Sequence, residues 1–169
     1  MTERLDLRNL ELTPGESTHV TRTVHIDPYR QAGQAYPPDA DEIPAEVDID
    51  AMLQGHSFRL RFETTMEGPC SRCLEPARVH FRIDSREIHD PRADDPELVS
   101  DFVHERELDI DAWAQDAIGL EFPTRVLCSE DCAGLCPVCG TNKNEGECAC
   151  VVDVTDSRWD KLKDLRLDE

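Results

Sequence analysis

The sequence predicts an α+β fold, in which one helix packs on an antiparallel sheet and a cysteine-rich segment follows. Two stretches alternate between apolar and polar residues, as strands with one buried face do. A later stretch carries apolar residues at helical spacing, and a dense cluster of cysteines lies beyond it. We therefore expect residues 1–125 to form the α+β domain and residues 126–169 to form an appendage with a short terminal helix.

The N-terminal part of the chain predicts two strands separated by a loop. Residues 18–26 alternate loosely between apolar and polar side chains, which indicates a strand. Residues 28–44 contain several prolines and a glycine, which indicate a loop. A second strand is expected at 47–53, before a turn at Gln54 and Gly55.

The clearest alternation predicts a β-hairpin. Residues 56–66 place apolar side chains opposite polar ones, and residues 78–84 repeat this pattern. Between the two strands lies the breaker-rich stretch GPCSRCLEP, which contains Cys70 and Cys73. We therefore expect a CxxC knuckle at the tip of the hairpin.

After a second breaker-rich loop, residues 108–120 carry apolar side chains along one helical stripe. Asp109 is the expected N-cap of this helix, and Pro123 is expected to end it. Near the end of the chain, Asp156 or Ser157 could cap a second, short helix.

Six of the eight cysteines fall within residues 127–151. Cys136 and Cys139 form a CxxC pair followed directly by a glycine, and Cys148 and Cys150 form a CxC pair downstream. Four thiolates can close a tetrahedral Zn²⁺ site with no open position, which is typical of structural rather than catalytic zinc. The segment has few large apolar residues with which to bury a core of its own. We therefore expect these four cysteines to bind one structural zinc ion in a zinc-knuckle segment.

The remaining cysteines predict a second Zn(Cys)₄ site that fastens the appendage to the sheet. Cys70 and Cys73 supply only half of a tetrahedral site, and Cys128 and Cys132 are spaced to suit one turn of distorted helix. Two alternatives remain open. Cys70 and Cys73 could stay unliganded thiols in a protein with a single zinc ion, or Cys128 or Cys132 could replace a cysteine of the CxC pair.

Eight cysteines could also form disulfides or a redox pair. The first residues, MTERLD, have neither the basic nor the apolar region of a secretory signal. No apolar run reaches the length of a membrane span, so no membrane association is expected. We therefore expect a cytoplasmic protein, where clustered cysteines are more often metal ligands than disulfides.

The chain is strongly acidic, with a net charge of −19 at pH 7. Such a charge opposes non-specific binding to nucleic acid or anionic lipid and suits a basic partner. Only the middle stretch, residues 56–92, holds more basic than acidic residues. That stretch is the one part of the chain that does not repel phosphate.

Five arginines of this middle stretch are candidate nucleic-acid contacts. Arg59, Arg61, Arg78 and Arg82 share the polar face of the predicted hairpin, and Arg72 lies at its tip. They could bind a few particular RNA phosphates without causing non-specific binding to nucleic acid in general. Considered alone, the residues favour the alternative, in which the arginines form weak ion pairs on an exposed sheet face. The expected partners are Glu63, Glu67, Glu75 and Asp84.

No catalytic constellation is found in the sequence. Glycine-rich nucleotide motifs, HExxH and GxSxG are missing, and the histidines are scattered outside the cysteine cluster. A zinc-dependent RNA-processing enzyme is disfavoured for want of catalytic groups. We therefore expect neither enzymatic activity nor a small-molecule substrate.

Three blocks of the sequence resemble the cysteine-rich version of the YceD-type family, the large-ribosomal-RNA-subunit accumulation proteins. The blocks are CSRCLEP at 70–76, GLCPVCGTNKNEGECAC at 134–150 and DSRWDKL at 156–162. The likeness extends from about Leu53 onward, and Ser157 stands where a proline is more usual. The resemblance implies a bacterial cytoplasmic factor needed for large-subunit rRNA to accumulate, with no catalytic residue to carry over.

Residues and resemblance together predict a non-enzymatic factor with structural zinc that binds an assembly intermediate of the large ribosomal subunit. Its direct partner in that precursor would be rRNA or a basic ribosomal protein. The alternative is an acidic adaptor or chaperone that holds a basic ribosomal protein without touching RNA.

Overall fold

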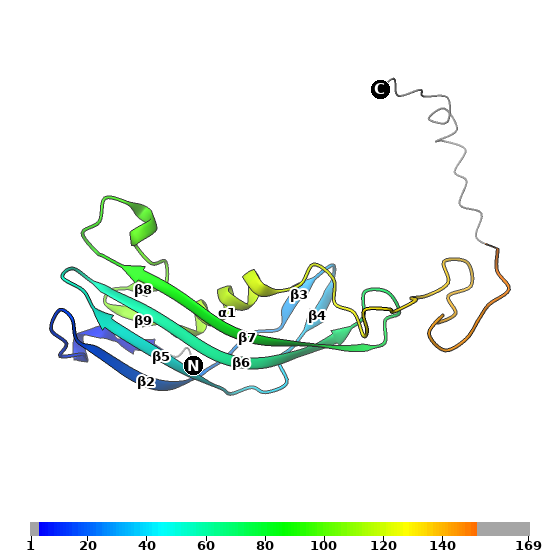
Figure 1. Cartoon of the computed structure of the whole chain (residues 1–169), viewed down its shortest axis with the longest axis horizontal. Helices are drawn as coiled ribbons and strands as arrows, with labels where there is room; N and C mark the ends of the chain where they lie inside the picture. Colours follow the sequence, from blue (N-terminus) through cyan, green and yellow to red (C-terminus); the bar gives the residue numbers. More distant parts are fainter. Residues whose placement is uncertain (1–3, 152–169) are drawn as a thin grey trace, which may run out of the picture.

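The computed structural model describes residues 4–151, and within them the fold is mixed α+β, as predicted. Antiparallel sheets of four, three and two strands accompany a single α-helix in this part of the chain. Figure 1 shows the helix α1 (Ile110–Glu121) and the two-stranded sheet on the same side of the four-stranded sheet. The predicted terminal helix at 156 or 157 lies outside the described residues.

The four-stranded sheet has the strand order β2-β5-β6-β7. Its strands are β2 (Ser17–Val24), β5 (Ile43–Ala51), β6 (His56–Pro69) and β7 (Pro76–His89). Gly55 turns the chain between β5 and β6 with a φ of +79°. A Cβ atom at this position would collide with the His89 carbonyl oxygen, so only glycine fits.

The predicted hairpin is confirmed, with longer strands than expected. β6 and β7 pair in register from His56 opposite His89 to Pro69 opposite Pro76. Phe58, Leu60 and other apolar residues of β6 are buried, while the polar residues between them stay partly or fully exposed. This alternation arises because one face of the sheet is covered and the other is open.

The prediction of a loop at 28–44 is wrong, because this stretch contains a small hairpin. β3 (Tyr29–Gln31) and β4 (Gln34–Tyr36) pair across a two-residue turn. Ala32 and Gly33 both have positive φ, of 49° and 81°, as a type I′ turn requires. The hairpin is anchored by its aromatic residues, since Tyr36 is buried and Tyr29 stacks on Phe122 with ring centroids 4.0 Å apart.

The second strand also begins earlier than predicted. β5 starts at Ile43 and ends at Ala51, and Leu53, which was expected to close the strand, is 91% exposed. Every second residue from Ile43 onward is buried, so the whole strand contributes one face to the core.

The helix α1 is capped as predicted. The Asp109 carboxylate accepts a hydrogen bond from the Ala112 backbone N–H at 3.0 Å, and the helix ends two residues before Pro123. Leu108 does not belong to the helix but to β9 (Glu107–Asp109). This strand pairs with β1 (Arg4–Asp6) and β8 (Val103–His104) in the three-stranded sheet.

The core lies between α1 and the four-stranded sheet. Trp113 is almost completely buried, and its Nε1 donates a hydrogen bond to Ser85 Oγ of β7 at 2.9 Å. Its ring also meets Phe58 edge-on. Within residues 4–151 no helix has the length and apolar character that a bilayer span needs.

Two histidines face each other at the end of the β6–β7 hairpin that is remote from its tip. Burial lowers the pKa of His56, and the positive charges of His89 and Arg106 lower it further. Burial also lowers the pKa of His89, where Asp90 opposes the shift and His104 adds to it. His89 Nδ1 is buried and has no hydrogen-bond partner among the described residues.

We expect this pair to make stability fall in acid. In the unfolded chain both rings bind a proton near pH 6.5, whereas the folded protein keeps them neutral to a lower pH. Stability is therefore full above about pH 6.5 and declines as the pH falls through the lowered folded pKa values. Urea unfolding between pH 5 and 8 measures this decline. It should be smaller in His56→Gln/His89→Gln and unchanged in the exposed control His80→Gln, and equal slopes in all three proteins would contradict the prediction.

Candidate metal centres

The tip of the β6–β7 hairpin forms a tight cysteine knuckle. Cys70 N–H donates to the Glu75 carbonyl at 2.8 Å, and Leu74 N–H donates to the Cys70 carbonyl at 3.0 Å. Leu74 has a φ of +66°, which lets the chain reverse directly after Cys73. The Arg72 backbone N–H points at Cys70 Sγ from 3.4 Å, so the knuckle turns a donor toward its sulfur.

A second segment brings two more cysteines to this knuckle. Ser71 donates to the Val126 carbonyl through its N–H at 2.8 Å and through its Oγ at 2.9 Å. A turn follows, in which Cys132 N–H donates to the Ser129 carbonyl. Arg72 Nη1 donates to the Cys132 carbonyl at 2.8 Å and joins the two segments again.

The four sulfurs gathered here all lie within 4.8 Å of one another. Cys70 Sγ is 3.8 Å from Cys132 Sγ, and Cys73 Sγ is 3.5 Å from Cys128 Sγ. Zn–S bonds of about 2.3 Å in a tetrahedron separate the sulfurs by about 3.8 Å. The geometry therefore fits a Zn²⁺ ion, and three of the four cysteines are buried.

The second cysteine set lies farther along the chain. The sulfurs of Cys136, Cys139, Cys148 and Cys150 also lie within 4.8 Å of one another. The Gly140 N–H donates to the Cys136 carbonyl at 2.9 Å, and its φ of +73° permits the reversal expected after a CxxC pair. This set also fits one tetrahedral ion.

The thiols in each set perturb one another. Burial raises the pKa of Cys70, but N–H groups directed at its sulfur outweigh burial and lower the pKa to about 6. The Thr141 hydroxyl and N–H lower the pKa of Cys139 to about 6. Burial raises the pKa of Cys73 to about 12, and the neighbouring Cys139 raises that of Cys150 to about 12. A bound cation would favour full deprotonation of either set, because it would balance the charge of the thiolates.

The cysteines are thus grouped in two sets of four, and Cys128 and Cys132 do not replace a member of the CxC pair. This grouping is the one on which the expectation of two Zn(Cys)₄ sites rests. That the sets hold metal stays a prediction.

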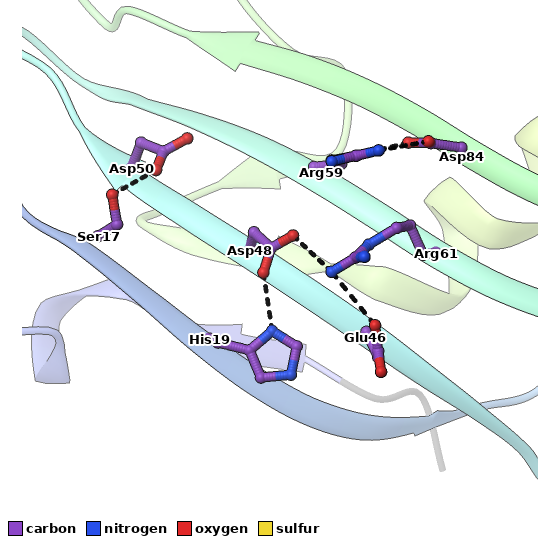
Figure 2. A network of polar contacts seen from close by, with 8 residues as sticks. All are labelled: Ser17, His19, Glu46, Asp48, Asp50, Arg59, Arg61 and Asp84. Carbon is purple, nitrogen blue, oxygen red and sulfur yellow. Dashed lines mark hydrogen bonds and ion pairs between the residues drawn. The ribbon is translucent and has the colours of Figure 1, made fainter.

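Four arginines of the hairpin lie on the open face of the sheet and are ion-paired, namely Arg59, Arg61, Arg78 and Arg82. Figure 2 shows Arg59 against Asp84, with N···O distances of 2.7 and 2.6 Å. Arg61 contacts Asp48 at 2.8 Å and Glu46 at 3.2 Å, both on the neighbouring strand β5. These two partners on β5 were not anticipated from the sequence.

The network continues to the next strand and along the hairpin. His19 Nδ1 lies 2.7 Å from Asp48, and this contact, with Arg61, lowers the pKa of the Asp48 carboxyl. Arg78 pairs with Glu67, and Arg82 pairs with Glu63 at 3.1 Å, but their side chains remain 74% and 83% exposed. Arg72 is separate from this surface, because it lies at the hairpin tip and its guanidinium donates to the Cys132 carbonyl.

A family model described as "Large ribosomal RNA subunit accumulation protein YceD" matches residues 58–166. This range contains all three blocks that carry the resemblance, and the match confirms it. Uncharacterized proteins of Mycobacterium tuberculosis (strain H37Rv) and Mycobacterium bovis are each 28% identical to this chain over 170 residues. Those alignments cover 95% of this chain and 80% of the relative.

An uncharacterized protein of Mycobacterium leprae is 26% identical over 130 residues, which cover 72% of this chain and 59% of that protein. No solved structure matches the chain.

Proposed function

This chain belongs to the YceD family of large ribosomal RNA subunit accumulation proteins, and we propose from this membership that it is a non-enzymatic assembly factor of the large ribosomal subunit. The match over residues 58–166 is the observation that carries the proposal. The protein would act in the bacterial cytoplasm by binding an assembly intermediate, through rRNA or a basic ribosomal protein.

Structural zinc is part of this proposal. The two sets of four cysteines would each hold one Zn²⁺ ion, since thiolate sulfurs at tetrahedral spacing are the ligands that structural zinc prefers. We propose a boundary between a domain at 1–125 and a cysteine-rich appendage at 126–169. The ion bound by Cys70, Cys73, Cys128 and Cys132 would take two ligands from each part and so join the domain to the appendage.

A second candidate partner follows from the charge. With a net charge of −19 and its hairpin arginines engaged by carboxylates, the protein suits a basic ribosomal protein as an adaptor or chaperone would. In this case the protein would not touch RNA.

Depletion and complementation test the function. A bacterium depleted of its own YceD-family protein should show a lowered ratio of large-subunit to small-subunit rRNA, and expression of this chain should restore it. An unchanged ratio on depletion, or no restoration by the folded chain, would refute the proposal. Capture of the tagged chain with and without ribonuclease then separates an RNA partner from a basic ribosomal protein.

The arginine surface, formed by Arg59, Arg61, Arg78 and Arg82, is a further proposed RNA contact. Arg78→Glu/Arg82→Glu should weaken binding to a large-subunit rRNA fragment, because these side chains are the most exposed of the four. Thermal stability should change little, since exposed ion pairs contribute only about 0.2–1 kcal/mol each. Filter binding at several salt concentrations measures the effect.

The matched variant is Glu63→Gln/Glu67→Gln, which frees the same two arginines from their carboxylates. It should strengthen binding to the same rRNA fragment. Equal affinities of the wild type and both variants for the rRNA fragment would contradict the proposed RNA contact and show that the arginines only form ion pairs.

A further inference from the structure

A groove of about 350 Å³ lies where the hairpin tip meets the chain that follows α1. One wall is the β3–β4 hairpin, which contributes Gln31 and Gln34. The other walls are the knuckle, with Arg72 and Leu74, and residues 123–126, which follow α1 and contribute Arg125. We call residues 123–126 the connecting segment. In Figure 1 the β3–β4 hairpin lies beside the part of β6 and β7 that leads to the knuckle.

This groove differs in charge from the grooves on the open face of the sheet. No carboxylate lines it, whereas Asp48 and Asp50 line one sheet-face groove and Glu46, Glu63 and Asp84 line another. A carboxylate-free groove is notable in a protein with a net charge of −19.

Its two arginines are also free of ion pairs. Arg72 and Arg125 are exposed, and within residues 4–151 neither forms a salt bridge, in contrast to Arg59, Arg61, Arg78 and Arg82 on the sheet face. Binding an anion at these side chains would therefore break no ion pair of the protein. The same step at Arg59 or Arg61 would have to displace a carboxylate.

Hydrogen bonds hold the walls of the groove together. Gln31 Nε2 donates to the Pro123 carbonyl at 3.0 Å, which joins β3 to the connecting segment. Both donors of Ser71 meet the Val126 carbonyl, which joins the same segment to the knuckle beside Arg125. The backbones that carry the two arginines are thus fixed before any ligand binds, which reduces the entropy lost on binding.

We propose that this groove binds the sugar–phosphate backbone of single-stranded RNA, with a phosphate held by Arg72 and Arg125. The inference rests on the proposed function and assigns it a surface. Planar guanidinium groups match phosphate oxygens, and the amide of Gln34 can both donate to and accept from a ribose 2′-hydroxyl. Leu74, 60% exposed at the rim, offers an apolar contact to a base. An acidic peptide could also bind the arginines but offers neither a 2′-hydroxyl nor a nucleobase, and it enters the test as an alternative outcome.

The test uses the zinc-loaded full chain and a fluorescent twelve-nucleotide oligouridylate. Anisotropy titrations at several salt concentrations give the slope of log K against log salt, whose magnitude is about 0.7 for each phosphate that the protein neutralises on a single strand. Arg125→Gln should reduce this magnitude by about 0.7 and weaken binding, while the zinc content stays unchanged. Arg92→Gln is the matched control, because Arg92 is also exposed and without a salt bridge in residues 4–151 but follows the opposite end of β7. Its slope should equal that of the wild type.

Three outcomes would overturn the groove as an RNA site. They are equal slopes for Arg125→Gln and wild type, no binding of the oligouridylate by wild type, and binding through Arg125 of a polyglutamate peptide in its place. The complementation assay separates this failure from failure of the proposed function. If the titrations overturn the groove while wild type restores large-subunit rRNA, the groove is refuted and the function stands. If wild type itself fails to restore it, the function is refuted, and the titrations still judge the groove.

Discussion

Serine in place of both Cys70 and Cys73 is expected to lower the zinc content from two ions per chain to one and to release the cysteine-rich segment from the sheet. Structural zinc contributes an apparent binding free energy of about 10–16 kcal/mol at neutral pH. The hydrogen bonds that also join the two parts, from Ser71 to Val126, from Arg72 to Cys132 and from the Leu135 N–H to the Arg72 carbonyl, contribute about 1 kcal/mol each. The metal therefore dominates this junction. Elemental analysis and hydrogen exchange of the amides from 126 to 135 measure both effects.

Burial complicates this substitution, because Cys70 and Cys73 are 0% and 3% exposed and serine would leave buried hydroxyl groups. Wild-type protein treated with a chelator is the control, since it loses the metal and keeps the sulfurs. Faster exchange from 126 to 135 in both samples supports the joint site. A single zinc ion in wild type that survives Cys70→Ser/Cys73→Ser would contradict it.

The hairpin and the helix could be predicted from the sequence because each presents one buried face to a single core. Alternation along β6 and the stripe along α1 record that burial directly. The β3–β4 hairpin could not be predicted, because strands of three residues are too short to show a period. Its position depends on the contacts of Tyr29 and Tyr36 with Phe122, which is remote in the sequence.

Pro44 explains why the start of β5 was missed. A proline argues against a central strand, because it lacks the N–H that the ladder needs. Here Pro44 lies opposite Thr23 of β2, but the pairing of β5 with β6 begins only at Ala45. The missing donor therefore removes no ladder hydrogen bond on the β6 side, and the strand can begin before the proline.

The candidate metal centres could be predicted in part, because the spacing of their cysteines is visible in the sequence. The spacing of the cysteines led us to expect two sets of four, with other arrangements left open, and the structure brings the expected cysteines together. The partners of Arg61 depend on the register of β5 against β6, which the sequence alone does not give. No sequence pattern pointed to Arg125, because the groove proposed to bind RNA is formed by three segments that meet only in the folded chain.

Serine in place of both Cys148 and Cys150 is expected to unfold residues 136–151 and to leave the α+β domain intact. Among these residues only Cys136 is buried, and Val138 and Val151 are 62% and 89% exposed. Hydrophobic burial therefore cannot hold this segment, and the proposed second zinc ion must supply its stability.

Trypsin cleavage after Lys143 measures that unfolding, because a protease cuts a segment that opens locally. Cleavage should be slow in the zinc-loaded wild type and at least about tenfold faster in the variant, since a loss of only 1.4 kcal/mol already raises the open population tenfold. The melting temperature of the domain should stay close to that of the wild type, because its core of α1 on the four-stranded sheet contains neither residue. Cys70→Ser/Cys73→Ser provides the reciprocal comparison, as it should leave the Lys143 site protected if the two metal sites are independent. Equal cleavage rates in wild type and Cys148→Ser/Cys150→Ser would show that something other than metal orders the segment.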